Sequence, residues 1–278
     1  MNCLICDSSL SDTYSEDSCM GLPVFRCSNC NLWVTGSSTD EVKKAADQIY
    51  SKEYWDDRES ESAIRSNYTD QNSLGKKRQW ISQTKYCHEF LKNTNTILEI
   101  GSGPGQTLYW FSENYDITGI EPDKRNVEMI NSKLKRGKCL AGFIEEIEIV
   151  GRFDLIWISH VFEHLVKPLD LLKRLQNHLT SNGVIFIEVP NCENEQVLHS
   201  SIVNHPSSFH FTKQSLMKLA KKSDYKIRKC DCIRSPTKTE GAINRVASKL
   251  GHTVYPYYPK IVSENTKQGT DLRIIISQ

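Results

Sequence analysis

The chain has 278 residues, with 35 Lys and Arg against 34 Asp and Glu, which is enough length for one or two domains with a buried core. Its 25% charged and 38% hydrophobic residues are typical of a globular chain, and the net charge of +1 argues against a protein built to bind nucleic-acid phosphates. No apolar run reaches the ~20 residues of a membrane span and no signal-peptide pattern opens the chain, so we expect a cytoplasmic protein with no membrane partner.

Four of the ten cysteines form two close pairs, Cys3 with Cys6 and Cys27 with Cys30. Two C-x2-C pairs at this separation are typical of a structural zinc site, in which four thiolates complete a tetrahedral coordination sphere. Residues 1–38 contain few large apolar side chains, so metal binding would supply the folding free energy of this part. We therefore predict a zinc ribbon over residues 1–38.

The rest of the chain divides into a polar segment and an alternation of strands and helices. Residues 39–72 are predicted to be a linker with some helix, and residues 73–278 a second domain. The helices are expected over residues 74–93, through Tyr109 and Phe111, over 123–134 and 168–179, and after a cap at Thr212. The strands are expected at 96–100, 116–120, around 139, at 153–158, 184–189, 227–233 and 272–276. Apolar strands that alternate with amphipathic helices predict an α/β fold with a mostly parallel sheet covered on both faces.

The strand at 96–100 runs into a glycine-rich turn, Gly101-Ser-Gly-Pro-Gly105, that precedes a helix. Glycines let the chain turn sharply and let a ligand approach the backbone. An acidic residue, Glu121, ends the next strand, where a carboxylate can accept hydrogen bonds from both hydroxyls of a ribose. Because the glycine spacing is not that of the dinucleotide motif, the sequence predicts a nucleotide-type cofactor other than NAD.

Four segments in this order resemble the successive motifs of Rossmann-like S-adenosylmethionine-dependent methyltransferases: Glu99–Gly105, Glu121, Phe153–Trp157 and Leu179–Glu188. The resemblance covers residues from about 80 to 278. It implies a Rossmann-like seven-stranded methyltransferase sheet whose last strand is antiparallel, and S-adenosylmethionine as the cofactor.

The same resemblance implies where the cofactor lies. The loop Gly101–Gly105 would lie against its methionine and ribose parts, and Glu121 would hold the ribose hydroxyls. The adenine would lie near Ile120, Pro122, Phe143 and Ile144. The cofactor-binding residues expected are Glu99, Gly101, Ser102, Gly103, Gly105, Glu121, Pro122, Phe143, Ile144 and Ser159.

Polar residues gather after the strand at 153–158, at the end where open α/β sheets bind ligands. If a helical turn begins there, His160, Glu163 and His164 share one face. A fourth candidate, His210, stands just ahead of the helix that begins after Thr212. We predict that these four residues, His160, Glu163, His164 and His210, are catalytic.

Two mechanisms fit the four residues. In the first, His164 or His160 is a general base for a substrate hydroxyl, and Glu163 orients the imidazole. In the second, all four bind a divalent metal that polarises the hydroxyl. This set is similar to that of the metal-dependent small-RNA terminal 2′-O-methyltransferases, which carry Glu where this chain has His160. Three histidines and one carboxylate suit Mn, Fe, Ni or Zn better than Mg. We prefer the general base and keep the second metal as the alternative.

The zinc ribbon, the Tyr-rich linker, the turn Val161–His164 and the segments Glu188–Asn191 and His210–Thr212 together resemble bacterial methyltransferases of surface-polysaccharide and nucleotide-sugar pathways. The related deoxysugar C-methyltransferases also begin with a zinc ribbon, but they carry a large additional C-terminal domain for which this chain ends too soon. We therefore expect O-methylation of a sugar or glycan hydroxyl, with sugar C-methylation as an alternative. The excursion over residues 235–271, which holds Tyr255, Tyr257 and Tyr258, is expected to be a lid or an interface.

Two further classes of function are alternatives to a sugar methyltransferase. Zinc ribbons also precede rRNA-modifying enzymes, so an RNA methyltransferase is the runner-up. Arg26 is the only cation in residues 1–42, which argues against a nucleic-acid partner. A non-catalytic binding protein with a cofactor fold is disfavoured by the intact glycine loop and Glu121.

Overall fold

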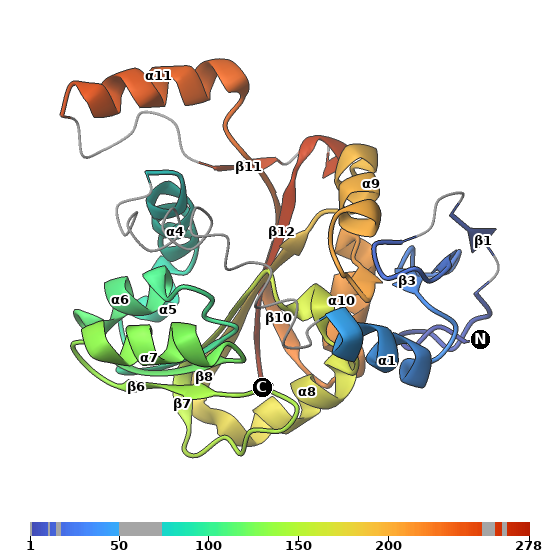
Figure 1. Cartoon of the computed structure of the whole chain (residues 1–278), viewed down its shortest axis with the longest axis horizontal. Coiled ribbons are helices and arrows are strands. Elements are labelled where there is room, and N and C mark those ends of the chain that lie inside the picture. Colours follow the sequence, from blue (N-terminus) through green and yellow to red (C-terminus); the bar gives the residue numbers. More distant parts are fainter. Residues whose placement is uncertain (1, 11, 15–17, 50–73, 252–258, 263–265) are drawn as a thin grey trace.

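The computed structural model describes residues 2–10, 12–14, 18–49, 74–251, 259–262 and 266–278 (Figure 1). A small N-terminal part lies beside an α/β domain that is built around one twisted sheet (Figure 1). Two predicted aromatic clusters lie outside the described residues, namely Tyr50, Tyr54 and Trp55, and Tyr255, Tyr257 and Tyr258.

The central sheet has eight strands within the described residues, in the order β11-β10-β12-β8-β7-β4-β5-β6. Their bounds are β4 Thr96–Ile100, β5 Asp116–Glu121, β6 Lys138–Ala141, β7 Phe153–Ser159, β8 Leu179–Pro190, β10 Lys226–Arg234, β11 Lys260–Val262 and β12 Asp271–Ser277. Strands β4 to β8 pair in parallel, whereas β12 is antiparallel to both of its neighbours. The predicted α/β fold is confirmed, and β11 is an edge strand that the sequence did not predict.

Helices cover both faces of the sheet (Figure 1). One face carries α4 Leu74–Tyr86, α5 His88–Leu91, α6 Gln106–Ser112 and α7 Lys124–Lys133, and the other carries α8 Pro168–Leu175, α9 Glu195–Val203 and α10 Lys213–Lys222. Successive side chains of a strand point to opposite faces. Leu155 and Trp157 of β7 therefore lie in one core, and Ile156 and Ile158 lie in the other. Burial on both faces explains why the strands are continuous apolar runs.

The helix ends follow local capping chemistry in most places. Thr212 caps α10 in a capping box with Ser215, as the sequence predicts. The helix expected over 168–179 instead ends at Leu175 and continues as the 3-10 turn η2 Gln176–His178, because Leu179 already pairs with Phe153 as the first residue of β8. The helix expected over 74–93 divides at Cys87 into α4 and α5.

The N-terminal part is a small sheet that a strand of the α/β domain completes. Strands β1 Asp12–Thr13, β2 Val24–Arg26 and β3 Trp33–Thr35 pair in sequence, and β3 pairs on its other side with β9 Phe209–His210. Helix α1 Thr39–Ile49 buries Val42, Ala45 and Ala46 against Met20. We call residues 2–10, 12–14 and 18–38 the ribbon.

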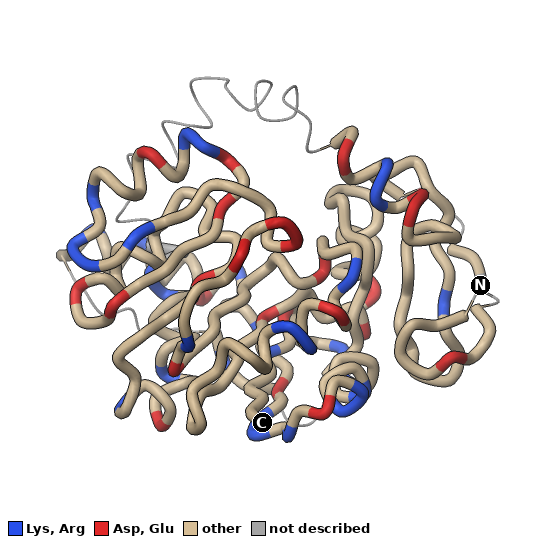
Figure 2. Tube along the Cα trace, turned by 90° about the horizontal axis from the view of Figure 1, so that it is seen from below, with Lys and Arg blue, Asp and Glu red and all other residues tan. Residues whose placement is uncertain are grey.

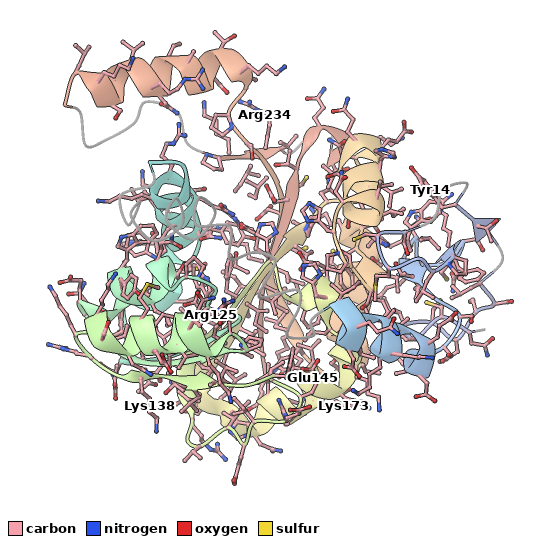
Figure 3. The ribbon with its side chains drawn as sticks, in the orientation of Figure 1. Tyr14, Arg125, Lys138, Glu145, Lys173 and Arg234 are labelled. Atoms are coloured by element: carbon pink, nitrogen blue, oxygen red, sulfur yellow. The ribbon has the colours of Figure 1, made fainter. Side chains whose placement is uncertain are left out.

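The ribbon shares a core with the α/β domain. Its Leu32 and Val34 belong to the same buried cluster as Phe209 and Phe211. At the edge of this contact, the Lys222 ammonium of α10 pairs with Asp7 at 3.0 Å. Tyr14 lies beside α9 (Figure 3), and its hydroxyl is 3.4 Å from Nδ1 of His199. The ribbon is therefore held on the domain by tertiary contacts as well as by the connecting chain.

The excursion between β10 and β12 contains the helix α11 Lys238–Lys249 and the 3-10 turn η3 Thr266–Gln268. Helix α11 extends away from the sheet (Figure 1), and Arg234 lies beside its first turn (Figure 3), where it pairs with Glu240 at 2.9 Å. Among the described helices, none combines the length and the apolar composition that crossing a bilayer requires.

Candidate active site and cysteine cluster

The four paired cysteines of the ribbon converge on one point. The Sγ atoms of Cys3, Cys6, Cys27 and Cys30 all lie within 4.8 Å of one another. Sγ of Cys3 is 3.4 Å from Sγ of Cys30, and Sγ of Cys6 is 3.3 Å from Sγ of Cys27. Zinc with bonds of ~2.3 Å to four sulfurs would separate them by about 3.8 Å, which is a small adjustment from this arrangement. The donor set therefore fits a structural zinc ion.

Both cysteine pairs lie in the same kind of turn. The residues that follow them, Asp7 and Asn31, have φ of 59° and 58°, a conformation that Asp and Asn adopt more readily than most residues. Each donates its amide to the carbonyl of the first cysteine, over 2.9 Å and 2.8 Å. The hydrogen bond between Cys3 and Cys30 lowers the pKa of Cys3 and raises that of Cys30, so this pair offers a thiolate to a cation.

The glycine-rich loop after β4 has one open position between two closed ones. Gly101, Gly103 and Gly105 have φ of +74°, +50° and +81°, a region that favours glycine. A Cβ on Gly101 would lie 2.2 Å from Cγ2 of Val161, and one on Gly105 would lie 2.5 Å from Cγ1 of Ile130. A Cβ on Gly103 would meet nothing within 4 Å. The loop thus packs at both ends and leaves its middle accessible to a ligand.

Glu121 lies at the end of β5 and faces this loop. Its Oε2 accepts a hydrogen bond from the amide of Gly103 at 2.8 Å, and its Oε1 accepts from the amide of Asp123 at 3.2 Å and from Asn126 at 3.4 Å. A carboxylate has about four acceptor positions, and these three bonds leave about one of them, on Oε2, for a ligand hydroxyl. Burial raises the pKa of Glu121, and the two amides oppose that shift.

The other expected cofactor residues divide into accessible and buried ones. Phe143 is 38% exposed and follows Gly142, whose amide donates to the carbonyl of Glu121 at 3.0 Å. Ile144 is buried in the core and lines no open surface. Pro122 is partly exposed beside Glu121. The backbone bond from Gly142 thus keeps the partly exposed Phe143 near the end of β5, where Glu121 lies.

Two buried polar atoms in this region have no hydrogen-bond partner within the described residues, namely Oε2 of Glu99 and Oγ of Ser102. Burial, and then the charge of Glu121, raise the pKa of Glu99 well above its usual value, which favours the uncharged form of this side chain. These groups fit a polar cofactor. S-adenosylmethionine, when bound, supplies an electrophilic methyl group on its sulfonium, and Gly103, Glu121 and Phe143 are the residues that would hold it.

The turn after β7 lies directly against the glycine loop, through the contact of Val161 with Gly101. Its first residue, His160, has a φ of 54°, and its amide donates to the carbonyl of Glu188 at 2.9 Å. The helical turn predicted here is the 3-10 turn η1 Phe162–His164, which begins after His160. A non-glycine residue held in the left-handed region is a form of strain that recurs at functional sites.

Three carboxylates surround the imidazole of His160. Its Nδ1 is 3.6 Å from Oε1 of Glu163, and its Nε2 is 3.3 Å from Oε1 of Glu188 and 3.6 Å from Oδ1 of Asp271. Burial opposes protonation, but Glu163 and Glu188 together raise the pKa of His160 well above its usual value. Because the three carboxylates stabilise the protonated ring, the surroundings of His160 suit a charged group better than a general base.

Glu188 is fully buried and forms an ion pair with Arg273. Its Oε1 also accepts hydrogen bonds from Gln83 at 2.7 Å and from Gln79 at 2.8 Å, both on α4. The predicted cofactor residue Ser159 faces this group, with its Oγ 3.4 Å from the same Oε1. Burial opposes ionisation, but Arg273 and His160 lower the pKa of Glu188. The charges at this edge of the sheet are thus compensated within the protein.

His164 presents the geometry of a general base. Its Nδ1 is 3.0 Å from the carbonyl of Pro206, so Nδ1 carries the proton and Nε2 presents a lone pair. Nε2 is 3.8 Å from Oε1 of Glu163, and a quarter of the side chain is exposed. Burial opposes ionisation of Glu163, but its contact with His160 lowers the pKa of Glu163, which is therefore a carboxylate. Its Oε2 is buried and has no hydrogen-bond partner among the described residues.

His210 does not join the other three predicted catalytic residues. It is fully buried, with Nε2 3.0 Å from Oγ1 of Thr35 in the ribbon and Nδ1 2.8 Å from Oγ of Ser201 in α9. Burial lowers the pKa of His210 to about 3, so the ring is neutral. In the described chain, the cysteines form the only group of three or more potential ligands close enough to share an ion. The predicted second metal site is not assembled in this arrangement.

Four further polar residues lie at this edge and are not expected there from the sequence, namely Gln79, Gln83, Asp271 and Arg273. Arg273 carried a readable signal, because a charged residue inside the apolar run 272–276 must find a buried partner. Its partner depends on the antiparallel register of β12 with β8, which places Arg273 opposite Glu188.

Comparison with known proteins supports the cofactor assignment. Residues 73–229 match the family described as methyltransferase domain. A stretch of 104 residues is 23% identical to the trans-aconitate 2-methyltransferase of Rhizobium etli and covers 36% of this chain and 41% of that protein. A stretch of 169 residues is 22% identical to the ubiquinone biosynthesis O-methyltransferase of Bradyrhizobium diazoefficiens, with 56% and 64% covered. The chain thus spans less than two thirds of the length of these curated relatives.

Solved structures share the fold over most of the chain. The plantazolicin methyltransferase BpumL, in complex with S-adenosylhomocysteine and a substrate analogue, has a TM-score of 0.53 at 19% identity, with 85% of this chain and 97% of that chain covered. An S-adenosylmethionine-dependent methyltransferase of Thermotoga maritima has a TM-score of 0.54 at 15% identity, with 84% and 97% covered.

Sheet order, glycine loop and Glu121 define the class as an S-adenosylmethionine-dependent methyltransferase fold. The family match spans more than half of the sequence, and the chain belongs to the methyltransferase domain family.

Proposed function

We propose that this protein transfers a methyl group from S-adenosylmethionine to a sugar or glycan hydroxyl, with His164 as the general base. The observation that carries the proposal is the lone pair on Nε2 of His164, which is defined by the bond from Nδ1 to Pro206 and lies beside the carboxylate of Glu163. This turn touches the glycine loop through Val161, so the base stands next to the cofactor site.

The residues of the turn act together in this reaction. His164 takes the hydroxyl proton on Nε2 while the substrate oxygen forms its bond to the methyl carbon and the carbon–sulfur bond breaks. Glu163 then faces an imidazolium at 3.8 Å and stabilises it. His160 lies between the carboxylates of Glu163 and Glu188 and balances their charge when its ring is protonated.

A hydroxyl-rich acceptor suits the polar groups beside His164. Oε2 of Glu163 is buried and has no hydrogen-bond partner among the described residues, so it is an acceptor that a substrate hydroxyl reaches only if the turn opens. The trans-aconitate and ubiquinone enzymes are named for other substrates, so the sugar rests on the motif resemblance and on this acceptor geometry.

Charge distribution supports a small substrate over RNA. Acidic and basic positions are intermixed along the described chain (Figure 2). Arg26 is the only cation in residues 1–42 of the sequence, so the ribbon carries no basic stripe. The ribbon is instead proposed to hold one structural zinc ion through Cys3, Cys6, Cys27 and Cys30.

The test is methyl transfer from radiolabelled S-adenosylmethionine to a panel of nucleotide-sugars, with RNA as a competing substrate. The variant His164→Gln is compared with His178→Gln, because His178 also has Nδ1 3.0 Å from a carbonyl, that of Gly151, but lies on η2. We expect the wild-type protein to methylate a sugar. His164→Gln should lose about 100-fold or more of this activity, and His178→Gln should keep the wild-type activity.

Two results would overturn the proposal. Turnover of RNA with none on any sugar or glycan would favour the RNA methyltransferase instead. Full activity of His164→Gln would show that His164 is not the general base. If a chelator abolishes activity while the ribbon keeps its zinc, the metal mechanism is favoured instead.

A further inference from the structure

We propose that Thr35 of the ribbon is a positioning residue for His164, so that the ribbon forms part of the active site's supporting structure. The assignment of His164 as base rests on the proposed function above. The contacts themselves run from β3 of the ribbon through residues 206–210 to the turn that holds His164.

The first link is between Thr35 and the segment Ser207–Ser208. The amide of Thr35 donates to the carbonyl of Ser208 at 3.0 Å, and its hydroxyl donates to the carbonyl of Ser207 at 2.8 Å. Thr35, Ser207 and Ser208 are all buried. The ribbon therefore fixes two consecutive peptide groups of the α/β domain in a place that water does not reach.

The second link joins the same segment to the catalytic turn. The amide of Ser208 donates to the carbonyl of Glu163 at 2.9 Å, and its hydroxyl donates to the carbonyl of His164 at 3.3 Å. The residue before this pair, Pro206, supplies the carbonyl that accepts from Nδ1 of His164. The carbonyl of Pro206, which sets the tautomer of His164, thus directly precedes the carbonyl of Ser207, which accepts from the Thr35 hydroxyl.

His210 is a third member of this hydrogen-bond network and joins Thr35 to Ser201 of α9. Because the hydroxyl of Thr35 donates to Ser207, it can only accept from His210, so Nε2 of His210 carries the proton. Nδ1 of His210 then accepts from the hydroxyl of Ser201 at 2.8 Å. The neutral state of His210, whose pKa burial lowers to about 3, agrees with this assignment. Both ring nitrogens of His210 therefore have a partner, and these bonds join the ribbon, α9 and residues 207–210 in one buried network.

The network gives the ribbon a specific task. The second cysteine pair ends at Cys30, and β3 begins three residues later at Trp33, so the proposed zinc site lies directly ahead of the strand that carries Thr35. Partners that orient a reactive imidazole typically change activity by about 10- to 100-fold when they are lost. Loss of the Thr35 hydroxyl should therefore reduce catalysis without disturbing the cofactor loop.

The experiment compares Thr35→Val with Thr35→Ser, which retains the hydroxyl. Thr180→Val is the matched control, because the Thr180 hydroxyl bonds Asp154 at 2.9 Å, away from the catalytic turn. For each full-length protein we would measure zinc content, kcat, KM for S-adenosylmethionine, and the ¹⁵N-imidazole NMR signal of the Nδ1–H of His164, assigned by its absence in His164→Gln.

We expect Thr35→Val to keep its zinc and its KM for S-adenosylmethionine, to lose about tenfold in kcat, and to shift or lose the Nδ1–H signal. Thr35→Ser should restore both kcat and signal. Ser208→Ala removes the hydroxyl bond to the carbonyl of His164 and leaves the backbone bonds of residue 208 in place. It should lower kcat in the same direction, and it remains a test if Thr35→Val does not fold.

The inference is overturned if Thr35→Val matches Thr180→Val in kcat and in the signal of His164, or if Ser208→Ala has wild-type kcat. Full activity of His164→Gln would instead overturn the proposed base, and the imidazole signal would still report whether Thr35 holds His164. The two failures are therefore distinguishable.

Discussion

Val161 stands against Gly101 so closely that a Cβ on the glycine would come within 2.2 Å of Cγ2 of the valine. The cofactor loop after β4 and the catalytic turn after β7 are therefore in van der Waals contact, because the ends of neighbouring parallel strands meet at one edge of the sheet. Because they are closely packed, neither segment can shift without displacing the other.

Gly101→Ala should be much more damaging than Gly103→Ala. At Gly101 the substitution combines a left-handed φ of +74° with a clash, so we expect a loss of about 2–4 kcal/mol in the free energy of unfolding. Gly103→Ala meets open space and should cost about 1 kcal/mol, but its methyl group would occupy the cofactor surface. Urea unfolding and S-adenosylhomocysteine titration measure the two effects. Equal destabilisation by both variants would contradict the packing.

Glu121→Gln should weaken S-adenosylhomocysteine binding by about tenfold or more. The amide would turn an N–H toward the amide of Gly103 or of Asp123 and would lose the charge that accepts the ribose hydroxyls. Calorimetric titration measures the Kd. Glu113→Gln, at an exposed ion pair with Lys135, serves as the control, and unchanged affinity in Glu121→Gln would place the ribose elsewhere.

The purified protein should contain one zinc ion per chain, and Cys27→Ser should lose it. Because the ribbon has little core of its own, the variant should also lower Tm by several degrees. Cys19→Ser is the matched control, since Cys19 is exposed in the same part of the chain and outside the cluster. Elemental analysis with thermal denaturation checks both, and zinc retained by Cys27→Ser at full occupancy would contradict a four-cysteine site.

His210 should make the protein less stable in mild acid. Above pH ~6.5 its imidazole is neutral in both the folded and the unfolded state and adds no pH dependence. Below that pH the unfolded chain binds a proton that the buried ring, with a pKa of about 3, does not bind, so the free energy of unfolding falls with pH. Between about pH 7.5 and about pH 5 this loss amounts to about 2 kcal/mol.

In His210→Gln this part of the pH dependence should disappear, which urea unfolding at the two pH values would measure. His178→Gln should keep the wild-type difference. A His210→Gln protein that loses as much stability in acid as the wild type would show that other groups cause the acid sensitivity.

Much of the fold could be predicted from the sequence because its signals are local. The strand at 96–100 was expected with the bounds it has, and the cap at Thr212 begins α10 as expected. The convergence of four cysteines followed from their spacing alone. In each case the deciding residues lie within a few positions of one another or within one repeated motif.

The parts that were missed depend on pairing between distant segments. His210 looked like a catalytic residue because it stands before a helix, but the pairing of β9 with β3 buries it against Thr35. The register of β12 with β8 brings Arg273 and Asp271 to Glu188 and His160, and no local pattern encodes that register. The site's electrostatics are therefore a tertiary property.

The pairing of β3 with β9 also has a consequence for biosynthesis. Thr35 and its partner Ser207 are 172 positions apart, so the edge of β3 stays unpaired on the nascent chain until most of the protein has left the ribosome. An unpaired strand edge invites association with other chains. A metal bound early by the two cysteine pairs would hold the first hairpin closed during that interval, which would make zinc supply a determinant of yield during expression.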